Sequence, residues 1–380
     1  MINAQVFYTA KETPITRLNY IVLKGKGVFM AAIFESIKDD NYEQIIFCND
    51  NTVGLKAIIA IHSSALGPAT GGCRMWNYRN EEEALTDVLR LSKGMTYKAA
   101  ISNLPLGGGK SIIIGDVSQK SPALLKRFGD FVETLRGNYI TAKDVGINSA
   151  DLKVIKSRTE HILGIAGEAN SSGDPSPVTA WGVYNGMKAC AEKAFKTKNL
   201  RGVRVALQGL GAVNYYLAKH LAEEGAVLTG CDISKEAIER AKKDFEIQIV
   251  SPEDIFDADC DVFSPGALGA IINSQTIPRF KCKVIAGAAN NQLATDRDGD
   301  ELVKRGIHYA PDYAINAGGL INISHEKDGY NRDRAWNQVA KIYDTIKMIL
   351  DHSEAEKTCT YVIANRIAEN RVKEANSARR

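Results

Sequence analysis

The segment 203–232 limits the possible folds of this chain more than any other part of its sequence. An apolar run is followed by a turn with Gly209 and Gly211, a helical pattern over 213–224, and a second apolar run that ends before Asp232. Gly209 permits a tight turn, Gly211 lets the backbone approach a ligand, and the helix N-terminus favours an anionic group such as a pyrophosphate. This order of strand, glycine turn, helix and strand predicts a βαβ unit that binds a dinucleotide.

The acidic residue at the end of the second strand indicates which dinucleotide binds. Asp232 would accept hydrogen bonds from the adenosine ribose hydroxyls and repel a 2′-phosphate, so we expect NAD rather than NADP. The third small position of the motif holds Asn214, so helix and strand must lie slightly apart, or Asn214 must turn outward. The alternative, a junction with incidental glycines, does not account for an Asp at this spacing. The cofactor contacts predicted for this unit are Gly209, Leu210, Gly211, Ala212, Val213, Asn214 and Asp232.

Two lysines lie beside apolar sequence, where solvated surface lysines are unusual: Lys98 in GMTYKAA and Lys110 in LPLGGGKS. The second segment is not a phosphate-binding P-loop, because that motif needs a glycine where Leu104 stands. Its three glycines instead suggest a backbone that passes close to a ligand and presents Lys110 into a cleft. One lysine can bind a carboxylate as a fixed cation, and its charge would favour the neutral form of the other, which makes Lys110 a general base.

Asp144 completes this predicted set. It follows an apolar run at 139–141 and could exchange a proton with a substrate amino group. Each lysine alone would more often be a surface or ion-paired residue. The two lysines, Asp144 and the dinucleotide unit together favour a catalytic site, and a catalytically silent NAD-binding regulator is the alternative from another class.

Apolar periodicity places the other elements of the chain. We expect strands at 55–61, 111–114, 139–141, 203–207, 226–231, 260–263 and 284–286, and helices that begin near Glu81 and at Ser121-Pro122. The first of these helices would carry Lys98 in or just after its last turn, while Lys110 would lie outside the strand 111–114. Apolar residues recur at helical spacing from Ala335 to Ile349, which predicts one long C-terminal helix.

Composition argues against several classes of function. The 380 residues are 44% hydrophobic and 24% charged, and the net charge of +3 gives no footprint for nucleic acid or an anionic membrane. Seven scattered cysteines form no C-x-x-C pair, so we expect no metal and a reducing cytoplasm. No run approaches the ~20 apolar residues that span a bilayer. Residues 1–29 differ from the rest and are either an N-terminal arm or the product of a mis-assigned start.

Seven segments from about Ile33 to about Arg371 occur in a specific order: LGPATGGCRMW, GMTYKAA, LPLGGGKSIIIGD, YITAKDVG, SSGDPSPVTAWGVY, AGAANNQL and YAPDYAINAGGLIN. Together they resemble the family of leucine, phenylalanine, valine and glutamate dehydrogenases, and most of all its leucine branch. The resemblance implies an α/β fold with two domains separated by a cleft. The expected parts are an N-terminal α/β substrate and oligomerisation domain (1–168, with 1–29 as a possible extra arm), a C-terminal Rossmann domain with a doubly wound parallel sheet (169–345), and a C-terminal helix that returns to the first domain (346–380).

The resemblance also implies a reaction, namely NAD-dependent oxidative deamination of an L-amino acid to a 2-oxo acid and ammonia. Lys98 would bind the α-carboxylate, Lys110 would activate the attacking water, and Asp144 would assist proton transfer. Further residues are implied near the substrate (Gly71, Gly72 and Arg74) and against the cofactor (Thr179, Asp232, Ala288 and Asn290). A homo-oligomer, an octamer as in the leucine branch, is implied as well.

The substrate side chain is the least determined feature. The positions that line its pocket in the family correspond to Thr70, Ala142, Leu320 and Ile323. Ala142 matches the leucine type, whereas the aromatic types carry Gly there, but Thr70 and Leu320 depart from the usual Leu and Val. Leucine, valine and isoleucine are therefore favoured without a ranking, and a phenylalanine or tryptophan type is the nearest alternative. Ala212, Asn214 and Gly266 stand where the family commonly has Asn, Ala and Cys.

Overall fold

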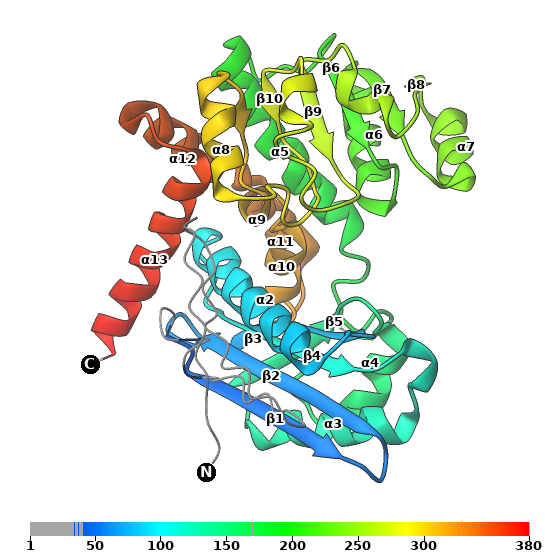
Figure 1. Ribbon diagram of the computed structural model, residues 1–380, viewed down its shortest axis with the longest axis vertical. Helices are drawn as coiled ribbons and strands as arrows, with labels where there is room; N and C mark the ends of the chain where they lie inside the picture. Colours follow the sequence, from blue (N-terminus) through cyan, green and yellow to red (C-terminus); the bar gives the residue numbers. More distant parts are fainter. Residues whose placement is uncertain (1–33, 35–36, 38–40, 169, 328, 380) are drawn as a thin grey trace, which may run out of the picture. The chain divides into compact units, whose positions relative to one another are not determined.

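The computed structural model describes residues 34, 37, 41–168, 170–327 and 329–379. The predicted N-terminal arm, 1–29, lies outside these described residues. From Tyr42 onward the chain forms one compact unit that contains two sheets, each with its own covering helices (Figure 1).

The first domain is built on a mixed sheet with the strand order β1-β2-β4-β3-β5. β1 and β2 are antiparallel, β2 and β4 are antiparallel, and β3 runs parallel to both β4 and β5. Helix α2 packs against β4, β2 and β3 on one face, while α3 and α4 cover the other (Figure 1). The elements are β1 (Gln44–Asp50), β2 (Leu55–Ser63), β3 (Ala69–Trp76), α2 (Glu81–Ile101), β4 (Gly107–Ile114), α3 (Pro122–Thr134), β5 (Tyr139–Lys143) and α4 (Ser149–Lys156).

Local sequence explains where the two longer helices of this domain begin. The side chain of Asn80 accepts a hydrogen bond from the backbone N–H of Glu83 at 2.8 Å, and the first turn of α2 carries three glutamates that favour the positive end of the helix dipole. Ser121 caps α3, and Pro122 occupies its first position. Both predicted starts are confirmed. Lys98 lies in the last turn of α2, also as predicted.

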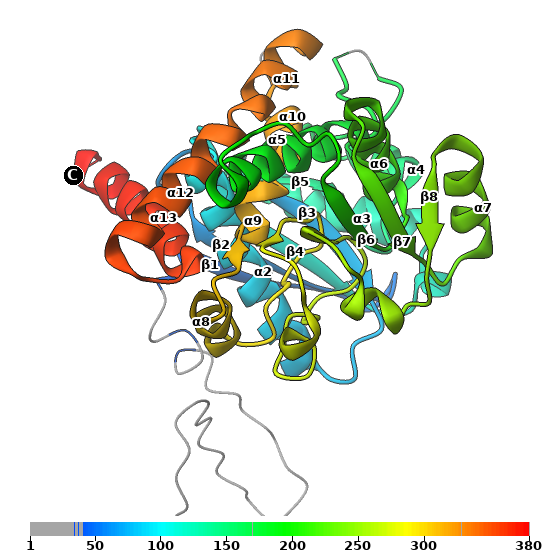
Figure 2. The same cartoon turned by 90° about the horizontal axis from the view of Figure 1, so that it is seen from above.

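The second domain has a sheet of six parallel strands in the order β11-β10-β9-β6-β7-β8, with helices on both faces (Figure 2). Alternate residues of β6 face opposite layers: Val205 and Leu207 join the core that includes α5 and α6, while Ala206 joins the core that includes α8. This is the predicted doubly wound Rossmann sheet. Its elements are α5 (Ser176–Phe195), β6 (Arg204–Gln208), α6 (Ala212–Glu224), β7 (Val227–Cys231), α7 (Lys235–Asp244), β8 (Ile247–Ile249), β9 (Val262–Pro265), β10 (Val284–Ile285), α8 (Asp296–Lys304), β11 (His308–Tyr309), α9 (Asp312–Ile315) and α10 (Gly318–Ser324).

The predicted long C-terminal helix is three helices: α11 (Arg332–Ala340), α12 (Ile342–Glu356) and α13 (Thr360–Ala378). The first break is small, because Lys341 keeps a helical φ of −68° while its N–H bonds three residues back, to Gln338. The apolar stripe therefore stays buried across the break. The second break is larger, since Lys357 adopts a left-handed φ of 52° and ends α12.

Helix α13 packs against α2 of the first domain. The Arg371 Nη1 donates to the backbone oxygens of Ala100 at 2.6 Å and Ile101 at 3.0 Å. These are carbonyls of the last turn of α2, which have no partner within the helix. The domain bounds at 168 and 345 stay predictions.

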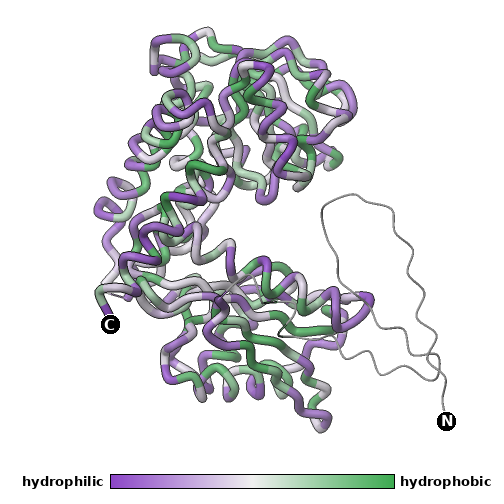
Figure 3. The backbone as a smooth tube through the Cα atoms, turned by 60° about the vertical axis from the view of Figure 1, so that its left-hand side comes forward, coloured by the Kyte–Doolittle hydropathy of each residue, from purple (hydrophilic) through white to green (hydrophobic). Residues whose placement is uncertain are grey.

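Hydrophobic stretches, green in Figure 3, alternate with hydrophilic ones along the chain. All seven cysteines are buried and free. In the described part of the chain, no helix combines the length and apolar character that crossing a bilayer requires.

Candidate active site

Lys110 projects from the middle of a strand. It lies in β4, where it pairs with Ala60 of β2, so the expectation that it lies outside the strand is wrong. Because β4 is an interior strand, neighbouring strands hold its backbone on both sides. The Lys110 side chain is buried, and its Nζ makes an ion pair with the Asp144 Oδ2. The sheet thus fixes the ammonium group more firmly than a loop would.

The glycines before Lys110 allow two protein segments to approach each other closely. A Cβ on Gly108 would lie 2.0 Å from the backbone nitrogen of Thr96 in α2. The nearest neighbours of a Cβ on Gly107, Gly108 or Gly109 are protein atoms, which gives these glycines a packing role; that this backbone lies close to a ligand stays a prediction. Glycine is needed because α2 crosses β4 almost in backbone contact. Since α2 carries Lys98, this contact brings Lys98 toward Lys110.

Lys98 is partly buried at the end of α2. Burial is the main reason that the pKa of Lys98 falls to about 8; the charge of Lys110 lowers it further, while Asp312 and Asp144 act in the opposite direction. A carboxylate that binds here would supply the negative charge that favours the protonated amine.

Asp144 follows β5 and reaches Lys110 across Gly72. A Cβ on Gly72 would lie 2.5 Å from the Lys143 carbonyl oxygen and 2.9 Å from the Asp144 Cβ, so only glycine leaves room for this approach. Burial raises the pKa of Asp144, but the charges of Lys110 and Arg74, whose Nε lies 3.6 Å from the Asp144 Oδ2, outweigh it and lower the pKa. The structure brings Gly72, Arg74, Lys110 and Asp144 together, and their catalytic roles stay predictions.

Arg74 links this cluster to α2. Its Nη1 donates to the Asp87 Oδ2 at 2.9 Å, and the Tyr78 hydroxyl donates to the same oxygen at 2.7 Å. Gly71, also predicted near the substrate, serves packing, because a Cβ there would lie 1.8 Å from the Gly109 carbonyl oxygen. Asp87 was not predicted from the sequence. The available signal was a charged residue among the apolar positions of α2.

Asp312 is a second missed residue. Its carboxylate lies within electrostatic reach of Lys98 and accepts a hydrogen bond from the backbone N–H of Tyr313 at 2.8 Å. Burial raises the pKa of Asp312, although that hydrogen bond and the charge of Lys98 oppose the rise. The available signal was its place in the segment YAPDYAINAGGLIN, where it begins α9.

The predicted dinucleotide turn has the expected geometry. Gly209 adopts a left-handed φ of +88°, and a Cβ on Gly211 would meet only open space before α6 begins at Ala212. The Asp232 carboxylate lies beside this turn, where it accepts the backbone N–H of Leu210 at 2.6 Å. Open space in front of a helix N-terminus, flanked by a carboxylate, fits a dinucleotide with free ribose hydroxyls.

Asn214 does not turn outward. It is 1% exposed, and its Nδ2 donates to the Gly209 carbonyl at 2.8 Å. The outward alternative is therefore wrong, because the space at this position is available on the inner side, above Gly266.

The other predicted cofactor residues lie around a buried asparagine. The Asn316 Nδ2 donates to the Ala288 carbonyl at 3.0 Å and to the Asn290 Oδ1 at 2.8 Å. Thr179 lies on α5, where its hydroxyl would meet a Cβ on Gly319 at 3.2 Å. Asn316 is a third residue that the sequence reasoning missed, although the quoted motif contains it.

Comparison with known proteins identifies the family. Residues 42–161 match the model of the Glu/Leu/Phe/Val dehydrogenase dimerisation domain, and residues 232–380 match that of Glutamate/Leucine/Phenylalanine/Valine dehydrogenase. The chain is 52% identical over 348 residues to the leucine dehydrogenase of Bacillus cereus, which covers 91% of this chain and 95% of that protein. The chain belongs to the Glu/Leu/Phe/Val dehydrogenase family. The resemblance found in the sequence is thereby confirmed.

Two further members show how far the similarity extends within the Glu/Leu/Phe/Val dehydrogenase family. An L-tryptophan dehydrogenase of Nostoc punctiforme is 45% identical over 348 residues, 91% of this chain and 97% of that protein. The crystal structure of L-tryptophan dehydrogenase from Nostoc punctiforme superposes with a TM-score of 0.81 at 42% identity, covering 91% of this chain and 99% of that one. The two-domain fold is thus that of the family.

The four positions predicted to line the side-chain pocket come from three elements. Thr70 lies in β3, Ala142 in β5, and Leu320 and Ile323 in α10. The Thr70 hydroxyl donates its hydrogen to the backbone oxygen of Pro68, just before β3, at 3.2 Å.

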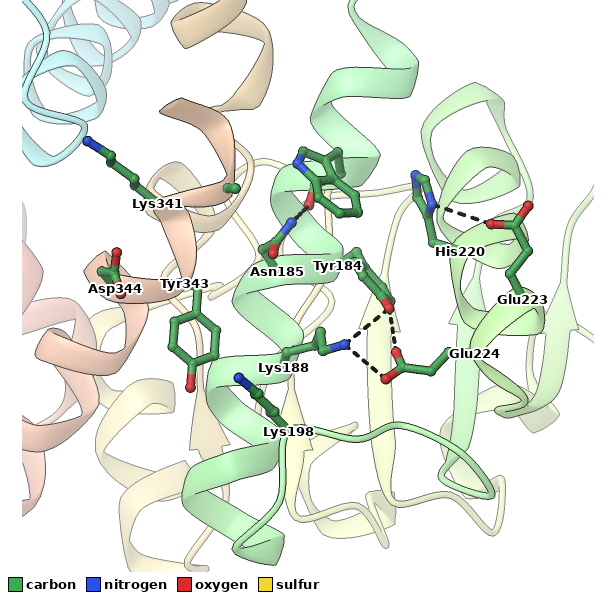
Figure 4. Close-up of a pocket in the computed structure, with 12 residues that line it drawn as sticks. Tyr184, Asn185, Lys188, Lys198, His220, Glu223, Glu224, Lys341, Tyr343 and Asp344 are labelled. Carbon is green, nitrogen blue, oxygen red and sulfur yellow. Dashed lines mark hydrogen bonds and ion pairs between the residues drawn. The ribbon is translucent and has the colours of Figure 1, made fainter. Parts of the chain in front are cut away.

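One hollow of the structure adjoins this cluster, and another lies away from it. One, of about 820 Å³, is lined by Arg74 and Asp87 together with Leu268 of the loop after β9. Another, of about 650 Å³, lies along α5, α6 and α12, and contains none of the predicted site residues (Figure 4). In it the Lys188 Nζ contacts the Glu224 Oε1 at 2.9 Å. Among the described residues, no group of three or more His, Cys, Asp or Glu side chains could hold a metal ion.

Proposed function

We propose that this protein catalyses the reversible, NAD-dependent oxidative deamination of a branched-chain L-amino acid to the 2-oxo acid and ammonia. The observation that carries the proposal is the grouping of Lys98, Lys110 and Asp144. Three separate elements, α2, β4 and the end of β5, bring them within ion-pair or electrostatic range of one another. A buried pair of cations beside one carboxylate suits a substrate that carries both a carboxylate and an amino group.

Each of the three residues has a distinct role in the proposed reaction. Lys98 holds the substrate carboxylate as a cation. Lys110 removes a proton from the water whose oxygen becomes the ketone oxygen, and Asp144 exchanges protons with the substrate nitrogen, which leaves as ammonia. Bound NAD supplies the acceptor for the hydrogen and two electrons that leave the α-carbon. The ion pair between Lys110 and Asp144 allows a proton to move between the two groups as water and amine are exchanged.

The proposed cofactor site combines the turn after β6 with the loop after β10. The backbone of Gly209, Leu210 and Gly211 and the N-terminus of α6 would hold the pyrophosphate. Asp232 would bind the ribose hydroxyls and disfavour a 2′-phosphate, which supports NAD over NADP. Thr179, Ala288 and Asn290 would contact the nicotinamide half.

An aliphatic substrate is supported by the pocket residues and by the relatives. Ala142 leaves less room for a ring than glycine would, and Leu320 and Ile323 offer an apolar lining. Leucine dehydrogenases are 52% and 50% identical to this chain, against 45% for the tryptophan enzyme. We rank leucine, valine and isoleucine above phenylalanine and tryptophan.

A homo-oligomer, an octamer in its full form, is part of the proposal. The matched N-terminal model describes a dimerisation domain, and β1 is an edge strand that presents Phe47 with 53% of its surface exposed. An exposed edge strand is a ready partner for another chain. Light scattering coupled to gel filtration would give the mass of the assembly, and a monomer would refute this part.

A substrate panel tests the proposed function. Formation of NADH is measured at alkaline pH with leucine, valine, isoleucine, phenylalanine, tryptophan and glutamate, and each assay is repeated with NADP. We expect the highest kcat/KM with a branched-chain substrate and NAD. A higher kcat/KM with an aromatic amino acid would refute the aliphatic assignment.

The matched variant is Lys110→Ala. It should keep NADH binding and lose turnover, because Lys110 is proposed to act on the water and not on the cofactor. If the unchanged protein binds NADH but turns over none of the amino acids, it is a binding protein and the proposed function is wrong.

A further inference from the structure

Asn214 occupies a position where the dinucleotide motif usually has a small residue, because helix and strand pack closely there. Its side chain is nevertheless 1% exposed. The Asn214 Nδ2 donates to the Gly209 carbonyl at 2.8 Å, and its Oδ1 has no hydrogen-bond partner within the described part of the chain. Gly209 is the residue of the turn with the left-handed φ. The amide therefore ties the first turn of α6 to the conformation of the glycine turn.

Gly266 provides the space for this side chain. A Cβ on Gly266 would lie 2.1 Å from the Asn214 Nδ2 and 2.4 Å from its Cγ, closer than real Cβ contacts occur. Gly266 does not have a left-handed φ, so its backbone conformation does not demand glycine. The three heavy atoms nearest to that Cβ all belong to the Asn214 side chain, so Asn214 is the main reason that residue 266 must be glycine.

Gly266 is also tied to the same strand as the turn. Its backbone N–H donates to the Gln208 carbonyl at 2.8 Å, and the Gln208 side chain lies 3.3 Å from the backbone nitrogen of Ala267. A shift at residue 266 therefore moves the end of β6, which immediately precedes Gly209. Asn214 and Gly266 therefore lie against each other and influence one turn from two sides.

We infer that Asn214 and Gly266 form an interdependent pair that positions the Gly209–Gly211 turn for dinucleotide binding. Both are positioning residues, and Gly266 tolerates a side chain only if Asn214 becomes smaller. The inference rests on the proposed function only in naming the ligand as NAD or NADH. Neither residue takes part in the chemistry of the amino acid.

Three variants separate the pair from general effects on folding. Asn214→Ala removes one hydrogen bond and should weaken NADH binding about three- to tenfold. Gly266→Ala forces the helix start and the loop apart and should weaken it at least tenfold. In Asn214→Ala/Gly266→Ala the new methyl group enters the vacated space while the bond to Gly209 stays absent, so affinity should recover from the level of Gly266→Ala to that of Asn214→Ala.

Two controls identify the cause. Asn214→Leu keeps the number and branching of the side-chain heavy atoms but is bulkier and lacks the donor, so it should bind NADH no better than Asn214→Ala if the bond to Gly209 matters. Gly94→Ala changes an exposed glycine of α2 with no atom within 4 Å of the added Cβ and should leave NADH affinity unchanged.

The measurements are the NADH dissociation constant by fluorescence titration, KM for NAD and for leucine, and the thermal midpoint. A positioning role raises the NADH dissociation constant and KM for NAD while KM for leucine stays constant, whereas a merely structural role lowers the midpoint and raises both KM values. The inference is overturned if Gly266→Ala binds NADH like the unchanged protein, or if the double variant is no better than Gly266→Ala. Should Gly266→Ala fail to fold, a double variant that also fails to fold or to bind overturns it. Loss of the proposed function is seen separately, as NADH binding without turnover of any amino acid.

Discussion

The lowered pKa of Lys98 leads to a pH dependence that can be worked out in advance. Lys98 must be protonated to hold a carboxylate, and burial brings its pKa to about 8. The binding-competent form is therefore present below that pKa and is lost as pH rises through it. At a pKa of 8 about 90% of Lys98 is charged at pH 7, half at pH 8, and about 10% at pH 9. The apparent affinity for a carboxylate should fall in proportion, about tenfold between pH 7 and pH 9.

The assay uses 4-methylpentanoate, which has the carbon skeleton of leucine without its amino group. Its inhibition constant is measured against leucine at saturating NAD from pH 6.5 to 9.5. Because the inhibitor carries no amine, its own charge is constant over this range. The charged neighbours of Lys98 are Lys110, Asp144 and Asp312, so the contribution of Lys98 itself has to be isolated with a variant.

Lys98→Arg supplies the control, since the guanidinium stays charged throughout the range. In this variant the inhibitor should bind more weakly at every pH, and its inhibition constant should not depend on pH. A flat profile in the unchanged protein would refute the assignment of Lys98 as the titrating carboxylate anchor. A tenfold change of the inhibition constant with pH that persists in Lys98→Arg would refute the same assignment.

Three further changes test the surroundings of the site. Ala142→Gly should raise kcat/KM for phenylalanine relative to leucine by about tenfold or more, as one methyl group in an apolar pocket is worth ~1–3 kcal/mol; an unchanged ratio in the substrate panel would remove Ala142 from the pocket. Gly108→Ala should lower the free energy of unfolding in urea by about 2–3 kcal/mol, because its Cβ would lie 2.0 Å from the Thr96 backbone. The control Gly94→Ala, in α2, should be neutral or stabilising, and equal effects of the two changes would contradict the packing argument. Arg371→Ala removes two hydrogen bonds to the end of α2 and should lower the free energy of unfolding by ~2 kcal/mol. It should also raise KM for leucine more than it lowers kcat, and Arg371→Lys should lie between Arg371→Ala and the unchanged protein; an unchanged KM in Arg371→Ala would show that α13 does not position Lys98.

Much of the architecture follows from local sequence. The cap of α2, the proline start of α3 and the glycine turn after β6 each depend on a few adjacent residues, and all three were predictable from them. The break between α12 and α13 was not, because Lys357 takes its left-handed φ without a glycine or asparagine to announce it. The apolar spacing identifies a buried face, and that face continues across Lys341 although the helix is interrupted there. The spacing alone therefore could not predict the break between α11 and α12.

The role of the glycines before Lys110 shows where sequence reasoning reaches its limit. A run of glycines indicates that something approaches the backbone, but not whether it is a ligand or another part of the protein. At Gly108 the approaching group is α2, which is known only once the two elements are placed. The same limit applies to Asp87, Asp312 and Asn316, since their importance depends on neighbours from distant segments.

The active-site cluster itself is a consequence of that close packing. Lys110 lies on an interior strand and cannot move far, so the distance to Lys98 is set by how deeply α2 lies on the sheet. Gly108 sets this depth, and Gly72 allows Asp144 to approach from the other side. The glycines therefore act on the chemistry indirectly: the close packing buries Lys98, which is the main cause of its lowered pKa, and holds it near the charge of Lys110, which lowers that pKa further. They also admit the carboxylate that compensates for the charge of Lys110. Any side chain at either position would separate the charged groups before it touched a substrate.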